Sequence, residues 1–189
     1  MNAEKYTQKA LEAVKTAQSM AQENGNQYVT SEHLLYALLD QDGGLIGSLF
    51  GKMGVDCDGL LSELDTLIRK LPRISGGSGE VYASPEVGKI FNLAEKTAEK
   101  LHDEYLSVEH LMLAIFSEGS QSVRQLLSDH GITRSRFSDE LAKVKTSPVT
   151  SDNPEDSYDA LKKYGTDLVE RARSKELDPV IGRDAEIRN

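Results

Sequence analysis

The chain has 189 residues, of which 38% are apolar, and its formal net charge at pH 7 is −9. This length suits one domain, or one domain with a piece of another, and the acidic charge argues against a nucleic-acid partner because phosphate contacts need clustered Lys and Arg. No apolar run is long enough to span a membrane, the start shows no signal-peptide pattern, and the single cysteine fits a reducing compartment. We therefore expect a cytoplasmic protein with no membrane partner.

One stretch of the sequence occurs twice, at a constant spacing of 77 residues. The first copy covers residues 29–39 and the second covers residues 106–116, and in each the Glu of Glu-His-Leu stands two residues after a hydroxyl residue, Thr30 or Ser107. The same spacing pairs Ala17 with Ala94 and Gly54 with Gly131. Such a repeat must be recognised before the fold is predicted, and it indicates one structural unit present in two copies.

The first copy, about residues 5–71, predicts four helices. The first begins after Thr7 and ends at the Asn-Gly-Asn of residues 24–26; the second covers about 31–40; the third covers about 45–53; the fourth follows the capping residue Asp56 and ends before Pro72. The second helix is apolar on most sides, so we expect it to be central and buried.

Residues 75–79, Ser-Gly-Gly-Ser-Gly, predict a flexible connector between the copies. A glycine-rich loop can instead hold phosphate, but that function needs a Gly-Lys-Ser/Thr ending and a flanking strand, and neither is present in the sequence.

The second copy, about residues 82–145, predicts the same four helices again. It begins at Ser84-Pro85-Glu86, which combines a capping residue, a first-turn proline and a first-turn acid. A buried helix at about 108–116 repeats the central element, and Thr133 can cap the last helix. The predicted fold is thus all-α, a pseudo-twofold tandem repeat of two four-helix units.

The rest of the chain differs in composition from the repeats. Residues 146–158 are polar and contain Pro148 and Pro154, which predicts an interdomain linker. Residues 159–189 predict a short helical and loop segment that is too short to form a core, and we interpret it as the truncated start of a further domain.

Four features of the sequence together resemble the Clp/Hsp-type AAA+ unfoldases. They are the doubled Glu-His-Leu unit, the linker, the Leu-Lys-Lys-Tyr-Gly-Thr-Asp-Leu run at 161–168 and the segment Leu177-Asp178-Pro179-Val180-Ile181-Gly182-Arg183. Among them, the Leu-Lys-Lys-Tyr run is most similar to the ClpB-type disaggregases. The resemblance implies a mobile N-terminal domain attached to the first ATPase module. It also implies a homohexameric ring that uses ATP and Mg and cooperates with a DnaK-type chaperone system.

For this chain the resemblance implies a module that captures exposed apolar segments of unfolded or aggregated proteins, here called clients. The alternative is a module that docks adaptors or degrons, as in the ClpC-like relatives of Clp proteases. In the family, Val180 and Ile181 would flank the adenine of bound nucleotide. The phosphate-binding Gly-x-x-x-x-Gly-Lys-Ser/Thr motif is absent from the sequence, so we expect no enzymatic activity and no cofactor for the chain itself. We also expect a monomer, because the hexamer contacts of the family lie mostly in its ATPase modules.

The resemblance also implies site residues. Thr7, Asp103 and Glu109 match polar residues that are implicated in chaperone activity, although Thr7 can also serve as a helix cap and Asp103 as a turn residue. Glu32 is a weaker candidate, because a first-turn acid stabilises a helix through its dipole. His110 is a further candidate for client binding, at a position where ClpB relatives often carry an apolar residue.

Phe91 and Leu93 are the apolar candidates for client binding. Their equivalents in the first copy are Val14 and Thr16, so the second copy carries extra apolar bulk on this helix. Such bulk indicates either a surface for a partner or tighter packing between the copies.

His33 and His110 occupy equivalent positions at the starts of the two central helices. A metal site would need further Cys or His residues at ligand spacing, and the sequence has none nearby. We therefore expect hydrogen-bonded structural histidines.

Overall fold

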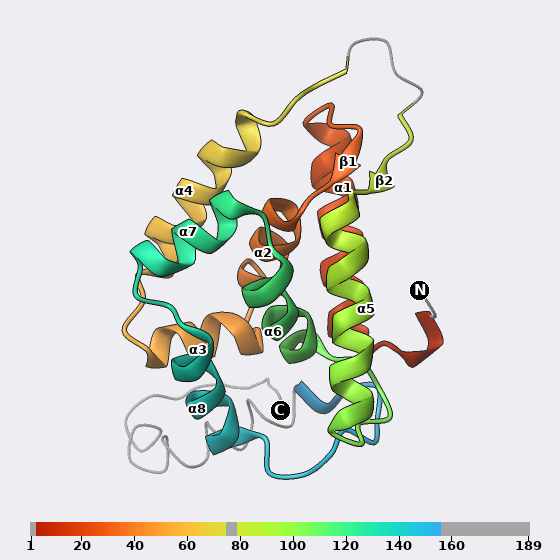
Figure 1. Ribbon diagram of the computed structural model, residues 1–189, viewed down its shortest axis with the longest axis vertical. Helices are drawn as coiled ribbons and strands as arrows, with labels where there is room; N and C mark the ends of the chain where they lie inside the picture. The colour runs from red at the N-terminus through yellow and green to blue at the C-terminus, as the bar shows by residue number, and fades with distance from the viewer. Residues whose placement is uncertain (1–2, 75–78, 156–189) are drawn as a thin grey trace, which may run out of the picture.

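The computed structural model describes residues 3–74 and 79–155, and it places eight α-helices in them (Figure 1). The predicted connector at 75–79 lies almost entirely outside the described residues, as do the segment 159–189 and its Val180 and Ile181. The elements, in chain order, are η1 (Ala3–Lys5), α1 (Gln8–Glu23), β1 (Tyr28–Val29), α2 (Ser31–Leu39), α3 (Leu45–Lys52), α4 (Cys57–Arg69), β2 (Tyr82–Ala83), α5 (Pro85–Lys100), α6 (Val108–Glu118), α7 (Gln121–Asp129) and α8 (Arg134–Val144).

Short polar side chains start the helices where the sequence predicts. The Thr7 hydroxyl accepts a hydrogen bond from the Ala10 amide at the start of α1, and Asp56, Ser84 and Thr133 do the same for α4, α5 and α8. Each bond satisfies a first-turn N–H that has no partner within its own helix. The all-α prediction is confirmed, and the expected helix starts agree with the structure.

The two repeats share one core. Helices α2 and α6 lie in the middle of the molecule, with α1 and α5 on one side and α3, α4, α7 and α8 on the other (Figure 1). The apolar cluster includes side chains from both repeats. Phe50 from α3 and Phe137 from α8 are both fully buried, and their ring centroids lie 6.1 Å apart in an edge-on arrangement. Neither repeat therefore encloses its own core.

Two short parallel pairings join the repeats, and the sequence did not predict them. Tyr28 and Val29 of β1 pair with Tyr82 and Ala83 of β2, and Tyr6 forms a matching isolated bridge with Leu106. We call the β1–β2 pairing the first junction and the Tyr6–Leu106 bridge the second junction. The two junctions are related by the 77-residue spacing, and each places the start of a long helix beside the start of a central helix.

The first part of the expected linker packs against the repeats. Val149 and Glu155 are 1% and 2% exposed. The backbone carbonyls of this segment accept hydrogen bonds from the amides of Glu104 and Gln8, which flank the two paired residues of the second junction. We call residues 149–155 the docked segment. None of the helices in the described parts of the chain is long and apolar enough to cross a membrane.

Candidate functional site

Three of the sequence-predicted site residues meet at the start of α6. Asp103 lies just before this helix, and its Oδ2 accepts hydrogen bonds from His110 Nε2 at 2.7 Å and from Lys145 Nζ at 2.6 Å. Lys145 Nζ also lies 3.0 Å from Glu109 Oε2. The side chains of Asp103, Glu109 and His110 are fully buried. One lysine therefore faces two buried carboxylates and a histidine.

The backbone decides which nitrogen of His110 carries the proton. The Ser107 amide donates to His110 Nδ1 at 2.9 Å, so Nδ1 must be the unprotonated acceptor. Nε2 then carries the hydrogen and donates it to Asp103. His110 thus takes the place of the Glu or Gln of a capping box, and its other nitrogen fixes the buried aspartate.

Thr7 joins the site from the other end of the chain. Its hydroxyl donates to Glu155 Oε2 at 2.7 Å while accepting from the Ala10 amide. The same Glu155 oxygen accepts from the Val108 amide, a first-turn N–H of α6, at 3.1 Å. A buried carboxylate therefore sits at the positive end of the α6 dipole, where negative charge is stabilised.

The buried carboxylates at the site differ in how many hydrogen bonds they receive. Burial opposes ionisation of Asp103, but hydrogen bonds from His110, Lys145 and the Val149 amide outweigh burial and lower the pKa of Asp103 to about 2. Burial raises the pKa of Glu155 above its ordinary value, and nearby Glu109 raises it further. Within the described residues, Oε1 of Glu109 and Oε1 of Glu155 are buried without a hydrogen-bond partner.

The first repeat has the same framework with different chemistry. His33 Nδ1 accepts from the Thr30 amide at 3.0 Å, and its Nε2 lies 3.0 Å from Asn26 Oδ1, so Asn26 stands where the second repeat has Asp103. Both histidines are hydrogen-bonded structural residues, as predicted. Burial raises the pKa of Glu32, and the amide of neighbouring Ser31 bonds to Glu86 of α5 at 3.0 Å. Glu32 thus belongs to the other junction, away from Thr7 and Glu109.

Phe91 and Leu93 lie on opposite flanks of α5. They are two residues apart on α5, and successive helical residues are separated by about 100°, so the two side chains flank the buried stripe on opposite sides. Phe91 is half-buried and packs edge-on against Tyr6, with ring centroids 6.3 Å apart. Leu93 is half-buried on the other flank.

A cleft lies next to the Tyr6–Phe91 pair. Its volume is about 880 Å³, and its lining residues come from η1, the end of α5 and the turn before α6. Five of them are acidic and one is basic: Glu4, Glu95, Glu99, Asp103 and Glu104 against Lys5. Tyr6 donates to Glu95 at 3.4 Å, and burial together with this carboxylate raises the pKa of Tyr6. The cleft therefore combines an aromatic wall with an acidic rim.

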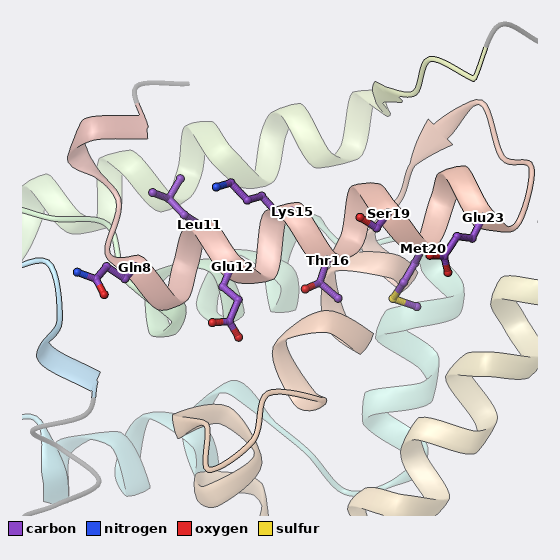
Figure 2. A pocket seen from close by; sticks show the side chains of 8 residues that line it. All are labelled: Gln8, Leu11, Glu12, Lys15, Thr16, Ser19, Met20 and Glu23. Atoms are coloured by element: carbon purple, nitrogen blue, oxygen red, sulfur yellow. The ribbon is translucent and has the colours of Figure 1, made fainter.

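A second, shallower hollow follows the exposed face of α1 (Figure 2). It has a volume of about 550 Å³, and all of its lining side chains come from this one helix. Leu11 and Met20 are its half-buried apolar members, and the others are polar or charged. No motif in the sequence distinguishes this surface.

Sequence reasoning missed Lys145 and Glu155. Lys145 follows the last helix and Glu155 lies in the expected linker, so neither belongs to a local motif. One signal for Glu155 was available: the repeat spacing places Lys9 opposite Glu86, so the second junction lacks the acid that the first one uses.

Comparisons with known proteins agree with this architecture. The sequence pattern of the Clp repeat (R) N-terminal domain matches residues 5–130. The chain is 41% identical, over its whole length, to the chaperone protein ClpB of Brucella suis, and it spans only 22% of that protein. Among solved structures, the Hsp104 N-terminal domain from Candida albicans matches with a TM-score of 0.71 at 17% identity, over 79% of this chain and 98% of that one.

A further solved structure is described as a complex of the ClpV N-domain with a VipB peptide. It matches with a TM-score of 0.60 at 20% identity and covers 80% of this chain and 90% of that one. At this identity the likeness concerns the fold alone.

Proposed function

The chain belongs to the Clp repeat N-terminal domain family, and from this premise we propose that it is a client-binding module of a protein-unfolding machine. The observation that carries the proposal is the acidic cleft lined by Tyr6 and Tyr105, with the half-buried Phe91 packed against the Tyr6 ring. An aromatic wall can pack against an apolar side chain, and an acidic rim attracts Lys and Arg. The clients are therefore extended segments with an apolar residue next to a basic one.

Binding at this cleft is expected to be weak. The cleft is open and offers few anchors, so little of the binding energy is left after the entropy of association is subtracted. Weak binding suits a module that must release clients, and several copies on one ring add avidity.

The machine itself lies outside this chain. Because the chain spans about a fifth of the Brucella protein, the activity of the whole protein belongs to the proposal. We propose that this chain is part of a longer cytoplasmic protein that binds ATP and Mg, forms a homohexameric ring and cooperates with a DnaK-type chaperone system. The chain alone is proposed to be a monomer without catalytic activity.

The proposal is tested with labelled 15-residue peptides that place a Phe-Leu pair beside lysines or beside glutamates. Fluorescence anisotropy should show tighter binding of the lysine peptide, and added salt should weaken it. Phe91→Ala should weaken it roughly tenfold, because the Tyr6 ring that lines the cleft loses the ring it packs against. Leu93→Ala is the matched control on the opposite flank and should leave binding unchanged. Equal binding of the lysine peptide by the parent chain and Phe91→Ala would end the proposal.

A second candidate function is adaptor docking along α1. Two observations favour it: the hollow on α1 lies on the exposed surface (Figure 2), and the ClpV N-domain of similar fold was solved with a peptide from another protein. Leu11→Asp would disrupt this surface while leaving the Phe91 cleft intact. A partner whose binding is lost with Leu11→Asp but not with Phe91→Ala would be an adaptor of this kind.

A further inference from the structure

At each junction a carboxylate accepts a hydrogen bond from a first-turn amide of the central helix, but the two carboxylates come from different parts of the chain. At the first, Glu86 from the first turn of α5 accepts from the Ser31 amide at the start of α2. At the second, the equivalent position in α1 is Lys9, and the first turn of α1 contains no acid. The carboxylate at the start of α6 is instead that of Glu155, which lies outside both repeats.

The docked segment, residues 149–155, is held as a bound peptide would be. The Val149 amide donates to Asp103 Oδ1 at 2.7 Å, and the Val149 carbonyl accepts from the Glu104 amide at 2.7 Å. Further along, the Asp152 carbonyl accepts from the Gln8 amide at 2.8 Å. The segment bends at residues 151 and 152 and enters a helical turn at 154, so main-chain bonds hold its first part and the Glu155 side chain holds its end.

Two side chains anchor the segment. Val149 is 1% exposed, yet it lies outside the apolar cluster that the two repeats share. Glu155 is 2% exposed and bonds to Thr7 and to the α6 amide through one oxygen, while its Oε1 has no partner in the described residues and its charge lies near that of Glu109. A buried carboxylate with an unsatisfied oxygen weakens docking, so the segment is suited to release.

We propose that the surface under the docked segment, formed by Thr7, Asp103, Glu104 and Val108, is a binding site for a peptide with an aliphatic residue and, six positions later, a carboxylate. The chain fills this site in cis with residues 149–155. The occupied site covers Thr7 and closes off the start of α6. It shares Asp103 and Glu104 with the lining of the proposed client cleft, but Thr7 and Val108 lie outside that lining, and the proposal does not depend on client binding there.

The test uses the full chain and a fluorescein-labelled peptide of residues 146–157 as the probe. In the parent chain, the tethered segment competes at an effective concentration in the millimolar range, so the probe should bind poorly. In Val149→Ser/Glu155→Ala, the site is open, and the probe should bind at least tenfold more tightly than to the parent. Adding Thr7→Val to the open variant should reverse most of this gain.

Three controls make the outcome decisive. Asp139→Asn removes an exposed carboxylate of α8 and should behave as the parent. Phe91→Ala in the open variant should not change binding of the probe, whereas an effect as large as that of Thr7→Val would show that the two sites are one. The isosteric variant Glu155→Gln retains the shape of the segment. In Glu155→Gln, the amides of Gln8, Glu104 and Val149, whose hydrogen bonds hold the docked segment, should exchange hydrogen at least tenfold faster than in the parent. The exchange rate of the Ser31 amide should stay unchanged.

The proposal fails if the probe binds the parent and the open variant equally, or if it binds neither at about 1 mM. It also fails if Glu155→Gln leaves the exchange of all three amides at the parent's rate.

Discussion

His33 and His110 hold the same place in the two repeats but use different partners. Each accepts a backbone N–H at Nδ1 and uses Nε2 on a side chain seven residues earlier, which is Asn26 in one repeat and Asp103 in the other. The neutral amide leaves His33 without a charged partner, and burial lowers the pKa of His33 from 6.5 to about 4.

His33 should therefore make the fold less stable in acid. The unfolded chain binds this proton near pH 6.5, whereas the folded chain binds it only near pH 4, so lowering the pH across this window stabilises the unfolded state. The free energy of unfolding should fall by up to roughly 3 kcal/mol from this residue. Gln can keep the capping bond but does not titrate. In urea unfolding, the stability gap between the parent and His33→Gln should narrow from pH 7 to pH 4, and a constant gap would contradict the assignment.

Asp103 makes the opposite contribution, because its carboxylate receives three donors. Its pKa of about 2 in the folded chain lies below its ordinary 3.8, so its stabilisation is complete above pH 4 and is lost as the pH falls toward 2. In Asp103→Asn, the amide oxygen can still accept from His110 and Lys145, as Asn26 does for His33, but the charge that pairs with Lys145 is lost and the NH2 group then faces the Val149 amide donor. At pH 7 we expect a loss of about 2–3 kcal/mol in the free energy of unfolding. Asp139→Asn should lose less than about 0.5 kcal/mol.

Family resemblance in the sequence identified Thr7, Asp103 and Glu109, and the structure brings them to one end of α6. It did not identify Lys145 or Glu155, because their partners are 42 and 148 residues away in the chain. Contacts at such separations are created by the docking of whole elements, and no local pattern encodes them. Comparison of the repeats singled out Phe91 and Leu93 as candidates for client binding, but it did not show that their positions are about 200° apart around α5.

At the level of elements, the local sequence predicted the helices well. A helix cap joins residues only three apart, so Thr7, Asp56, Ser84 and Thr133 were all found from their neighbours. The two-residue strands β1 and β2 were missed because their pairing joins residues 54 apart and arises only when the repeats dock.

Two glycines in the second repeat should respond oppositely to alanine. Gly88 lies inside α5, and a Cβ placed there meets nothing within 4 Å, so Gly88→Ala should stabilise the fold by about 0.5–1 kcal/mol through helix propensity. Gly119 ends α6, and a Cβ there would lie 2.7 Å from the Ile115 carbonyl oxygen. Gly119→Ala should therefore cost about 1–3 kcal/mol. Thermal unfolding of both variants beside the parent measures the difference, and a shift of the same sign in both would contradict this description of the α6 end.

At the level of the whole molecule, the two repeats form one cooperative unit. The Phe50–Phe137 contact crosses between them, and Arg136 of α8 donates to the Met53 carbonyl at 2.6 Å. Ser31 adds a link at the first junction: its hydroxyl bonds to Glu86 of α5 and accepts from the Ser120 amide at 2.9 Å. We therefore expect denaturant to unfold both repeats in a single transition.

Substitutions of Glu86 and Glu155 should distinguish the stability of the whole fold from the stability of the docked segment. Both carboxylates sit at the start of a central helix, but Glu86 belongs to a helix that packs in the fold, whereas Glu155 belongs to the docked segment. Glu86→Gln weakens a charge-assisted bond between elements of the shared fold, so the midpoint of the urea transition should fall by an amount equivalent to about 1–2 kcal/mol. Glu155→Gln should leave this midpoint within about 0.5 kcal/mol of the parent while loosening only the docked segment. Equal midpoint shifts in the two variants would mean that residues 149–155 unfold together with the repeats, and that the segment is part of the fold and not its ligand.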